Sequence, residues 1–452
     1  MKKLMSSFIA LLLAGPFLTA QSSRTFPEEN ASDAAIIRAA RDLSAGASTV
    51  EDVLKLDKAL EKDPDNDALH YYLARCYFLT NPTEAEKHLV EAVRLDPENS
   101  TYLETLANFY SASGNEAKSG ELLVKLLEKY PEKYSNERTL TALADSQLAQ
   151  MKDTLALENF DKALLFDPTY IPAILGRSEV FRMRGNMPAF FVALEPFTSD
   201  ETIAPAPKCD YVNQILSRVN GRFFRAYGPQ LDSMVTSCVK AHPTDSSTFL
   251  LAGRWFYATD RKELGESYFG RLLENYPEML EAHYIRIQLL GAKNDDAGII
   301  SECETIYGLC ASNPKEQVRV LSIMGDTYHS MGDVRMCYKT YDRALKIDPL
   351  YVPILNNYAY FLCLEKRKLA KAEKMSRVTV EAEPENATYL DTLGWILHLR
   401  GRDAEAKPLF KKAMAHGGKD SGEVLRHYSE VLSALGEKDL ATYYKGLADN
   451  KK

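Results

Sequence analysis

Residue types that perform catalysis or bind metals are present, but their spacing does not assemble a site. The eight histidines are dispersed, and none forms a cluster with cysteine or aspartate at spacings that suit zinc. The chain contains no glycine-rich phosphate loop, no GxSxG, no HExxH and no paired His–Cys arrangement. His416-Gly417-Gly418 could form an oxyanion turn, but no serine lies in a matching context, so it is interpreted as a helix stop. The sequence therefore predicts no enzyme activity, no cofactor and no metal site.

Carboxylates are abundant, and some of them recur in a pattern. The segments KDPDN, LDPEN, FDPTY and IDPLY each place an aspartate directly before a proline. Aspartate favours turns because its side chain hydrogen-bonds the backbone two residues further on. These aspartates are therefore interpreted as turn residues rather than as catalytic carboxylate pairs.

The seven cysteines are an odd number with no CxxC pair: Cys76, Cys209, Cys238, Cys303, Cys310, Cys337 and Cys363. Cys303 and Cys310 are seven residues apart on one predicted helix, which separates them by about 10 Å along its axis. That separation exceeds the roughly 7 Å between Cα atoms that a disulfide tolerates. Most of the others occupy apolar helical positions and are predicted to be core residues. A disulfide with leftover thiols remains an alternative in an oxidising compartment.

The first 20 residues have the pattern of a signal peptide. Lys2 and Lys3 precede an apolar run, Phe8–Leu18, that is too short to span a bilayer, and Ala20 offers a small residue for cleavage. A short membrane anchor is the alternative. No cysteine precedes Cys76, so lipid attachment is not expected. The prediction is a chain exported to the periplasm, soluble, not a lipoprotein, and without an integral membrane span after signal removal.

The overall charge argues against nucleic acid as a partner. The net charge is −8, and the loss of two lysines with the signal peptide lowers it to −10. Nucleic-acid binding usually needs a basic stripe, and none is apparent in the sequence.

Prolines that close apolar helical runs divide the chain at regular intervals. They are Pro64, Pro97, Pro131, Pro168, Pro243, Pro277, Pro349 and Pro384. Successive gaps are 33, 34, 37, 75, 34, 72 and 35 residues, so the two long gaps each hold two units. A period near 34 residues is typical of stacked helix–turn–helix units.

Small and large apolar residues recur at fixed offsets within these units. In the unit that begins at Val318 they are Leu321, Met324, Gly325, Tyr328, Gly332, Cys337, Tyr341, Ala344 and Pro349. A glycine or alanine where the two helices cross lets their backbones approach, and large residues fill the space between neighbouring pairs. We therefore expect Gly325→Leu to destabilise the fold by overpacking, and Asp326→Ala to affect binding only.

With these offsets the chain resembles the tetratricopeptide repeat family from about residue 30 to residue 450, most closely its exported bacterial members. The resemblance implies an all-α, right-handed superhelical solenoid of eleven or twelve helix pairs. The predicted divisions are a signal peptide at residues 1–20, an N-terminal repeat block at 21–197, a Pro-rich hinge loop at 198–207, and a C-terminal repeat block with a capping helix at 208–452. The hinge belongs to a segment, 185–236, in which five prolines interrupt the pattern. The alternative there is an inserted functional loop.

The resemblance also implies where a partner binds. In this family, partners usually lie along the concave face made by the first helix of each pair. By offset, the corresponding residues are Asn108, Asp145, Arg254, Asp326, Asn356, Tyr360, Asp391 and Trp395. Asn356 and Asn357 resemble the subclass that clamps C-terminal carboxylates, but Ser322 and Asp326 stand where lysine or arginine is needed. The aspartates instead favour a basic or neutral protein or peptide, while Trp395 either anchors it or packs against the next pair.

Three functional interpretations follow. The leading one is an exported scaffold for protein–protein interaction. The second is a periplasmic chaperone-like assembly factor for envelope or secreted proteins. The third is an enzyme accessory, or an enzyme whose site lies within residues 185–236. Self-association is also possible, because terminal repeats need capping.

Overall fold

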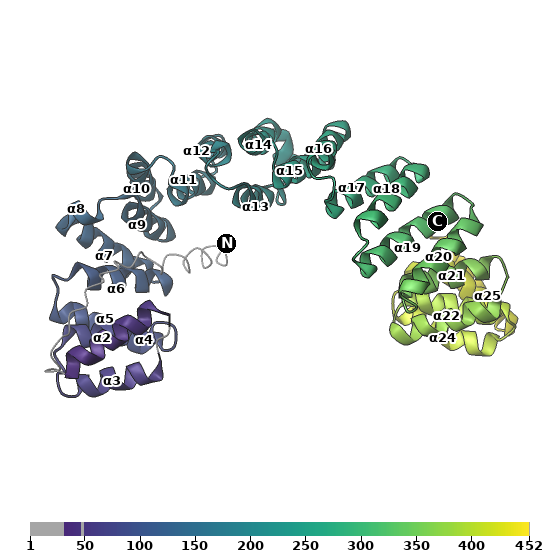
Figure 1. Ribbon diagram of the computed structural model, residues 1–452, viewed down its shortest axis with the longest axis horizontal. Coiled ribbons are helices and arrows are strands. Elements are labelled where there is room, and N and C mark those ends of the chain that lie inside the picture. Colours follow the sequence, from purple (N-terminus) through teal and green to yellow (C-terminus); the bar gives the residue numbers. More distant parts are fainter. Residues whose placement is uncertain (1–30, 47–48, 452) are drawn as a thin grey trace. The chain divides into compact units, whose positions relative to one another are not determined.

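The computed structural model describes residues 31–46 and 49–451, and regular structure within them is entirely helical (Figure 1). The helices are α2 (Ala31–Ser44), α3 (Val50–Leu60), α4 (Asp67–Tyr77), α5 (Pro82–Leu95), α6 (Ser100–Ala112), α7 (Glu116–Lys129), α8 (Pro131–Tyr134), α9 (Glu137–Ala149), α10 (Asp153–Phe166), α11 (Ile171–Met183), α12 (Met187–Ser199), α13 (Pro205–Leu216), α14 (Gly221–Ala241), α15 (Ser246–Ala258), α16 (Lys262–Asn275), α17 (Leu280–Ala292), α18 (Asp296–Leu309), α19 (Pro314–Ser330), α20 (Val334–Ile347), α21 (Val352–Leu364), α22 (Leu369–Ala382), α23 (Ala387–Leu399), α24 (Asp403–Ala415), η1 (Gly418–Asp420), α25 (Gly422–Ala434) and α26 (Lys438–Asp449).

In the part of the chain that the structure describes, the α-helices other than the four-residue α8 form twelve consecutive pairs, α2 with α3 through α25 with α26. Each pair has a first and a second helix joined by a short turn. Neighbouring pairs also pack on one another, as α10 does on α11 and α22 on α23. The predicted all-α solenoid of eleven or twelve pairs is confirmed.

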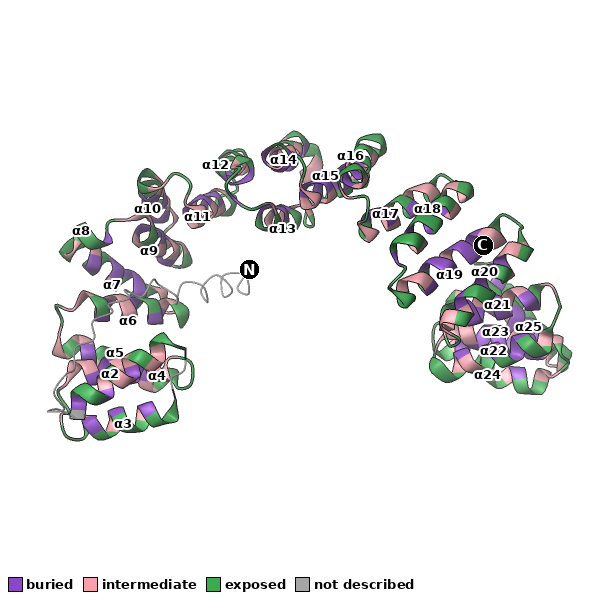
Figure 2. Ribbon diagram, viewed as in Figure 1, coloured by how far each residue is buried: buried purple, intermediate pink, exposed green. Residues whose placement is uncertain are grey.

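In three helix pairs a glycine of the first helix faces an aromatic ring of the second helix. A Cβ atom on Gly325 would stand 2.3 Å from Tyr341 Cε1, and one on Gly394 would stand 2.7 Å from Phe410 Cε2. Gly253 on α15 meets Phe269 on α16 in the same way, whereas Gly176 on α11 meets Phe160 on α10, the second helix of the preceding pair. Buried residues accordingly lie along the facing sides of the paired helices (Figure 2). The offsets predicted from the sequence are therefore the crossing points of the fold.

The turn glycines have the conformation that their positions predict. Gly332 and Gly401 have φ angles of +80° and +72°, in the left-handed region that residues with a Cβ atom rarely adopt. Asn66, Asn99 and Asn386 then cap the N-termini of α4, α6 and α23 by accepting backbone hydrogen bonds. Local sequence thus sets both ends of these helices.

The chain divides into two compact units, unit 1 up to Leu251 and unit 2 from Ala252, and the division falls within α15. The predicted hinge at 198–207 comprises the end of α12, a connection at 200–204 and the first turn of α13. Lys208, which directly follows, is fully buried and donates a hydrogen bond to the carbonyl of Asp200. The role of this segment as a hinge stays a prediction.

The sequence also predicts a signal peptide and no membrane-spanning helix after its removal. The signal peptide at residues 1–20 lies outside the described residues. Within the described part, no helix combines the length and the apolar character needed to cross a membrane.

The cysteines lie mainly in the core, as predicted. Six of the seven are buried and Cys76 is partly buried, and none of the seven is joined in a disulfide. Burial raises the pKa of Cys303 and of Cys337 to about 12, so neither carries appreciable thiolate at neutral pH.

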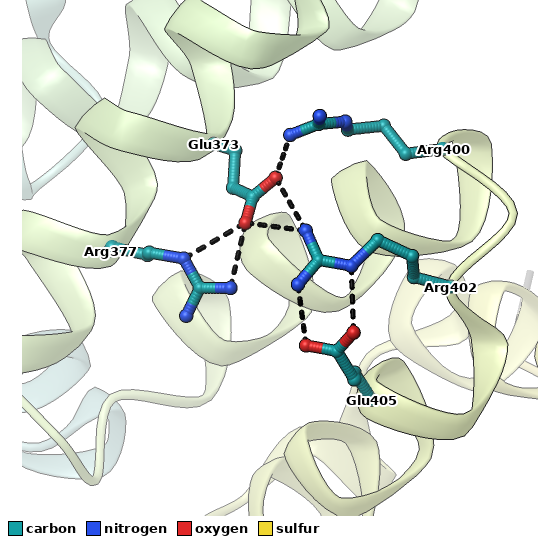
Figure 3. A network of polar contacts seen from close by, with 5 residues as sticks. All are labelled: Glu373, Arg377, Arg400, Arg402 and Glu405. Atoms are coloured by element: carbon teal, nitrogen blue, oxygen red, sulfur yellow. Dashed lines mark hydrogen bonds and ion pairs between the residues drawn. The ribbon is translucent and has the colours of Figure 1, made fainter.

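A cluster of ionic side chains joins α22 to the following helix pair (Figure 3). Glu373 on α22 is only 6% exposed, and its oxygens accept hydrogen bonds from Arg377 at 2.7 Å, from Arg402 at 2.8 Å and from Arg400. Arg402 also binds Glu405, at the start of α24. Burial favours the neutral form of Glu373, but the arginines outweigh it and lower its pKa. The carboxylate therefore holds two pairs together as a charged group.

Candidate protein-binding face

All eight predicted partner-binding residues lie on first helices, but the structure brings together only the five on α19, α21 and α23. Asn108 on α6 is exposed, and Asp145 on α9 is partly buried, both in unit 1. Arg254 on α15 is exposed and pairs with Glu281 at 2.6 Å. The other five lie on the successive first helices α19, α21 and α23, and they are Asp326, Asn356, Tyr360, Asp391 and Trp395.

On α19, the carboxylate of Asp326 already accepts hydrogen bonds from two side chains. Asp326 accepts a hydrogen bond from the Tyr341 hydroxyl and another, at 3.0 Å, from Asn357 Nδ2. Burial raises the pKa of Asp326, while these two donors act in the opposite direction. Asp326 therefore also fixes Tyr341, the ring that faces Gly325. The expectation that Asp326→Ala would affect binding only does not fit this contact.

Asn356 presents a buried acceptor without a donor. Asn356 is only 5% exposed, and its Nδ2 donates a long hydrogen bond of 3.4 Å to Asn357 Oδ1. Its Oδ1 accepts no hydrogen bond from any residue that the structure describes. A buried amide oxygen left without a donor costs about 1–3 kcal/mol. Asn356 is thus an unsatisfied polar position on an otherwise well-packed helix.

At α23 and α25 an aspartate and a histidine are buried beneath a tryptophan. Asp391, 5% exposed, lies 3.0 and 3.2 Å from His427 Nδ1 through its two oxygens. The ring of Trp395 stacks on His427 with centroids 4.1 Å apart and on His398 with centroids 4.8 Å apart. Of the two roles considered for Trp395, packing against the next pair is therefore the one that the structure shows.

A hydrogen bond closes this group across α23. The hydroxyl of Tyr360 on α21 donates to Glu423 on α25, so side chains of two first helices meet past the one between them. We call this set of side chains the first-helix polar face; it comprises Asp326, Asn356, Asn357, Tyr360, Asp391, Trp395, Glu423 and His427.

Sequence reasoning missed Glu423 and His427. A signal for His427 was present, because Asn357, Thr392 and His427 follow one another at intervals of 35 residues. The repeat offset therefore places His427 one helix pair after Thr392.

Asp145 in unit 1 differs from these aspartates because no described residue forms a hydrogen bond or ion pair with its carboxylate. Burial, with a smaller contribution from the negative charge of Glu116, raises the pKa of Asp145 to about 7. At neutral pH this carboxyl group is thus close to half protonated, and a cation brought by a partner would favour its charged form.

This pKa gives a test of how Asp145 is placed. The folded chain keeps the Asp145 proton up to about pH 7, whereas the unfolded chain loses it near 3.8. Asp145 therefore lowers stability progressively as the pH rises from about 4 to about 7. We expect Asp145→Asn to stabilise the protein by about 1–2 kcal/mol at pH 8 and to leave it unchanged at pH 4. Thermal unfolding at both pH values measures this, and an equal gain at both would contradict it.

Two histidines that the sequence showed as dispersed form a contact in unit 1. His70 and His88 approach through their Nδ1 atoms at 2.8 Å, and His70 Nε2 lies 3.1 Å from the carbonyl of Pro64. In unit 2, His283 makes the same contact as His70, with its Nε2 2.8 Å from the carbonyl of Pro277. These histidines fix a first helix to the turn before it. No group of three or more potential metal ligands occurs among residues 31–46 and 49–451.

The segment 318–349 holds most of α19, all of α20 and the closing Pro349. It matches the tetratricopeptide repeat family. This tetratricopeptide repeat contains the Gly325–Tyr341 crossing and Asp326, the first member of the first-helix polar face. The predicted resemblance is confirmed for this repeat.

Solved structures also align with the chain at low identity. PilF of Pseudomonas aeruginosa aligns at 20% identity over 57% of this chain and 97% of its own, with a TM-score of 0.31. Yeast Tom70 aligns at 14% identity over 93% and 92%, with a TM-score of 0.39. MamA of Desulfovibrio magneticus RS-1 aligns at 14% identity over 38% and 94%, with a TM-score of 0.34. No curated protein matches the chain.

Proposed function

We propose that this chain is a non-enzymatic scaffold that binds a protein or peptide partner on its first-helix polar face. The observation that carries the proposal is the buried Asn356 Oδ1, which has no donor among the described residues. A bound segment that displaces the side chains covering this oxygen would supply the donor from a backbone N–H, because an asparagine amide can pair with a peptide backbone.

The remaining side chains define the chemistry of the partner. The face contains three acidic residues, Asp326, Asp391 and Glu423, and one histidine, so it favours a segment that brings N–H groups or positive charge. Tyr360 adds aromatic surface of the kind that dominates binding energy at interfaces. A partner that contacts Glu423 has to compete with the Tyr360 hydroxyl for the same carboxylate.

We further propose that the chain is exported to the periplasm, as residues 1–20 predict. The test is the N-terminal sequence of the chain purified from the envelope fraction of its source cell. A start at Gln21 supports export with cleavage after Ala20. An intact N-terminus in the cytoplasmic fraction contradicts it.

Partner binding can be tested by site-specific photo-crosslinking in the source cell. Thr388, exposed on the first helix α23 one turn before Asp391, is replaced by a photo-reactive amino acid. Lys412, exposed on the second helix α24, receives the same residue as a control. A discrete cross-linked protein from position 388 alone supports the proposal. Many weak products favour the chaperone-like alternative, and equal products from both positions contradict a first-helix site.

Asn356→Leu separates a binding role from a structural one. Leucine is close in size to asparagine and removes the buried oxygen that lacks a donor, so we expect stability to be unchanged or higher by about 1 kcal/mol. Cross-linking from position 388 should be lost in the same variant. Urea unfolding measures the first effect, and a destabilisation above about 2 kcal/mol would show that the amide is structural.

A further inference from the structure

A second charged surface lies on the second-helix side of unit 2, where α20 carries a row of cations. Four exposed basic residues are spaced by about one helical turn along one side of α20, and they are Arg335, Lys339, Arg343 and Lys346. With a rise of 1.5 Å per residue they extend over about 16 Å. They line a shallow hollow together with Tyr338 and Asp342. We call these four residues the α20 basic row.

No cation of the α20 basic row has a carboxylate partner among the residues described in the structure. Elsewhere in the chain, exposed lysines such as Lys118 and Lys293 pair with glutamates at 3.1 and 2.6 Å. Asp342, the acidic residue within the row, is instead 3.6 Å from Lys371 of α22. The row therefore presents uncompensated positive charge on a chain whose net charge is −8.

The neighbouring second helix leaves room beside the row. At positions 38 residues earlier, which are equivalent in the repeat, α18 has only small uncharged residues, namely Ala297, Ser301, Thr305 and Gly308. All four residues are exposed, and a Cβ atom on Gly308 would meet nothing within 4 Å. The guanidinium of Arg343 lies over the ring of Tyr307 on α18, 3.9 Å from its centroid. This contact turns Arg343 toward the bare strip of α18.

We propose that the α20 basic row and the bare strip of α18 bind an acidic peptide segment with carboxylates at alternate residues. Cations four residues apart on a helix are separated by about 6 Å along its axis, and alternate side chains of an extended peptide are about 6.6 Å apart. Successive carboxylates of one extended segment can therefore meet Arg335, Lys339 and Arg343 in register. Arginine adds paired N–H donors that match a carboxylate. This surface is separate from the first-helix polar face and does not depend on the function proposed for it.

A peptide fits this surface better than a membrane does. Peripheral membrane binding normally combines basic residues with large apolar side chains that enter the lipid. The strip beside the row has only small, uncharged residues, and the row is a single helix wide.

The test measures fluorescence anisotropy of a labelled peptide of alternating glutamate and serine with the full chain. The double variant Lys339→Glu with Lys346→Glu changes two exposed cations that have no described partner, so its fold should be unaffected. The matched control, Lys411→Glu with Lys412→Glu on α24, makes the same charge change on another second helix. We expect the first variant to lose affinity by at least about tenfold and the control by less than about threefold. Affinity of the wild-type chain should also fall between 50 and 300 mM salt.

Several results would overturn the proposal. Equal losses in the two double variants would mean that the peptide senses only net charge. Equal binding of a peptide with glutamine in place of glutamate would exclude carboxylate recognition. If the wild-type chain fails to bind the peptide but binds phosphatidylglycerol vesicles or a single-stranded oligonucleotide through Lys339 and Lys346, the row serves a different polyanion.

Discussion

Gly325→Leu is expected to lower the free energy of unfolding by about 3 kcal/mol, the upper part of the range for overpacked cores. A Cβ atom at this position would stand 2.3 Å from Tyr341 Cε1, and Tyr341 is fully buried. The ring cannot move aside cheaply, because its hydroxyl donates to Asp326. Urea unfolding of wild type and variant, followed by circular dichroism, measures the difference.

Gly270→Ala is the matched control in the same unit. Gly270 lies inside α16, and a Cβ atom there would meet nothing within 4 Å. Alanine is a better helix former than glycine, so this variant should gain up to about 1 kcal/mol. Opposite signs for the two glycines would establish the crossing as the cause. Similar small effects at both would refute the packing account of Gly325.

Glu373→Ala is expected to cost about 2–3 kcal/mol, because Arg377, Arg400 and Arg402 would then face one another without the carboxylate that binds them. The arginine side chains remain 51%, 34% and 34% exposed, so water screens part of their repulsion and keeps the cost below that of a fully buried charge. Hydrogen exchange should show the loss of protection concentrated in α22 and α24. Uniform loss throughout unit 2 would contradict a local tie.

Glu405→Gln provides the comparison within the same cluster. Glu405 is 54% exposed and contacts Arg402 alone among the three arginines, so we expect a change of less than about 1 kcal/mol. A loss as large as that of Glu373→Ala would mean that the cluster acts through its total charge rather than through the buried carboxylate.

The fold could be predicted because the information that specifies it is local and repeated. Each pair carries its own crossing residue, turn glycine and closing proline within about 34 residues, as Gly325, Gly332 and Pro349 do. The prolines of 185–236 suggested an interruption, but α13 and α14 form a helix pair there. Pro205 lies in the first turn of α13, where proline is tolerated. Pro229 lies inside α14, where Tyr227 departs from helical angles with φ −131° and ψ 15°.

The candidate site could be predicted only as a set of positions. Offsets placed Asp326, Asn356 and Asp391 on first helices, since helical periodicity decides which face a residue occupies. Which side chains contact one another depends on the angle at which successive helix pairs stack, and the repeat spacing in the sequence does not give that stacking angle. The Tyr360–Glu423 and Asp391–His427 contacts join residues 63 and 36 positions apart and so could not be found from spacing within a unit.

The hydrogen bond from Tyr360 to Glu423 also has a mechanical consequence. It spans from α21 to α25 and thus sets the bend of three successive pairs by a side-chain contact in addition to their packing. Helical repeat arrays interact only between neighbours, so a strut that skips one pair stiffens the array locally. A ligand that bound Glu423 in place of the Tyr360 hydroxyl would remove this contact, so binding at the face would be coupled to the stacking of these three pairs.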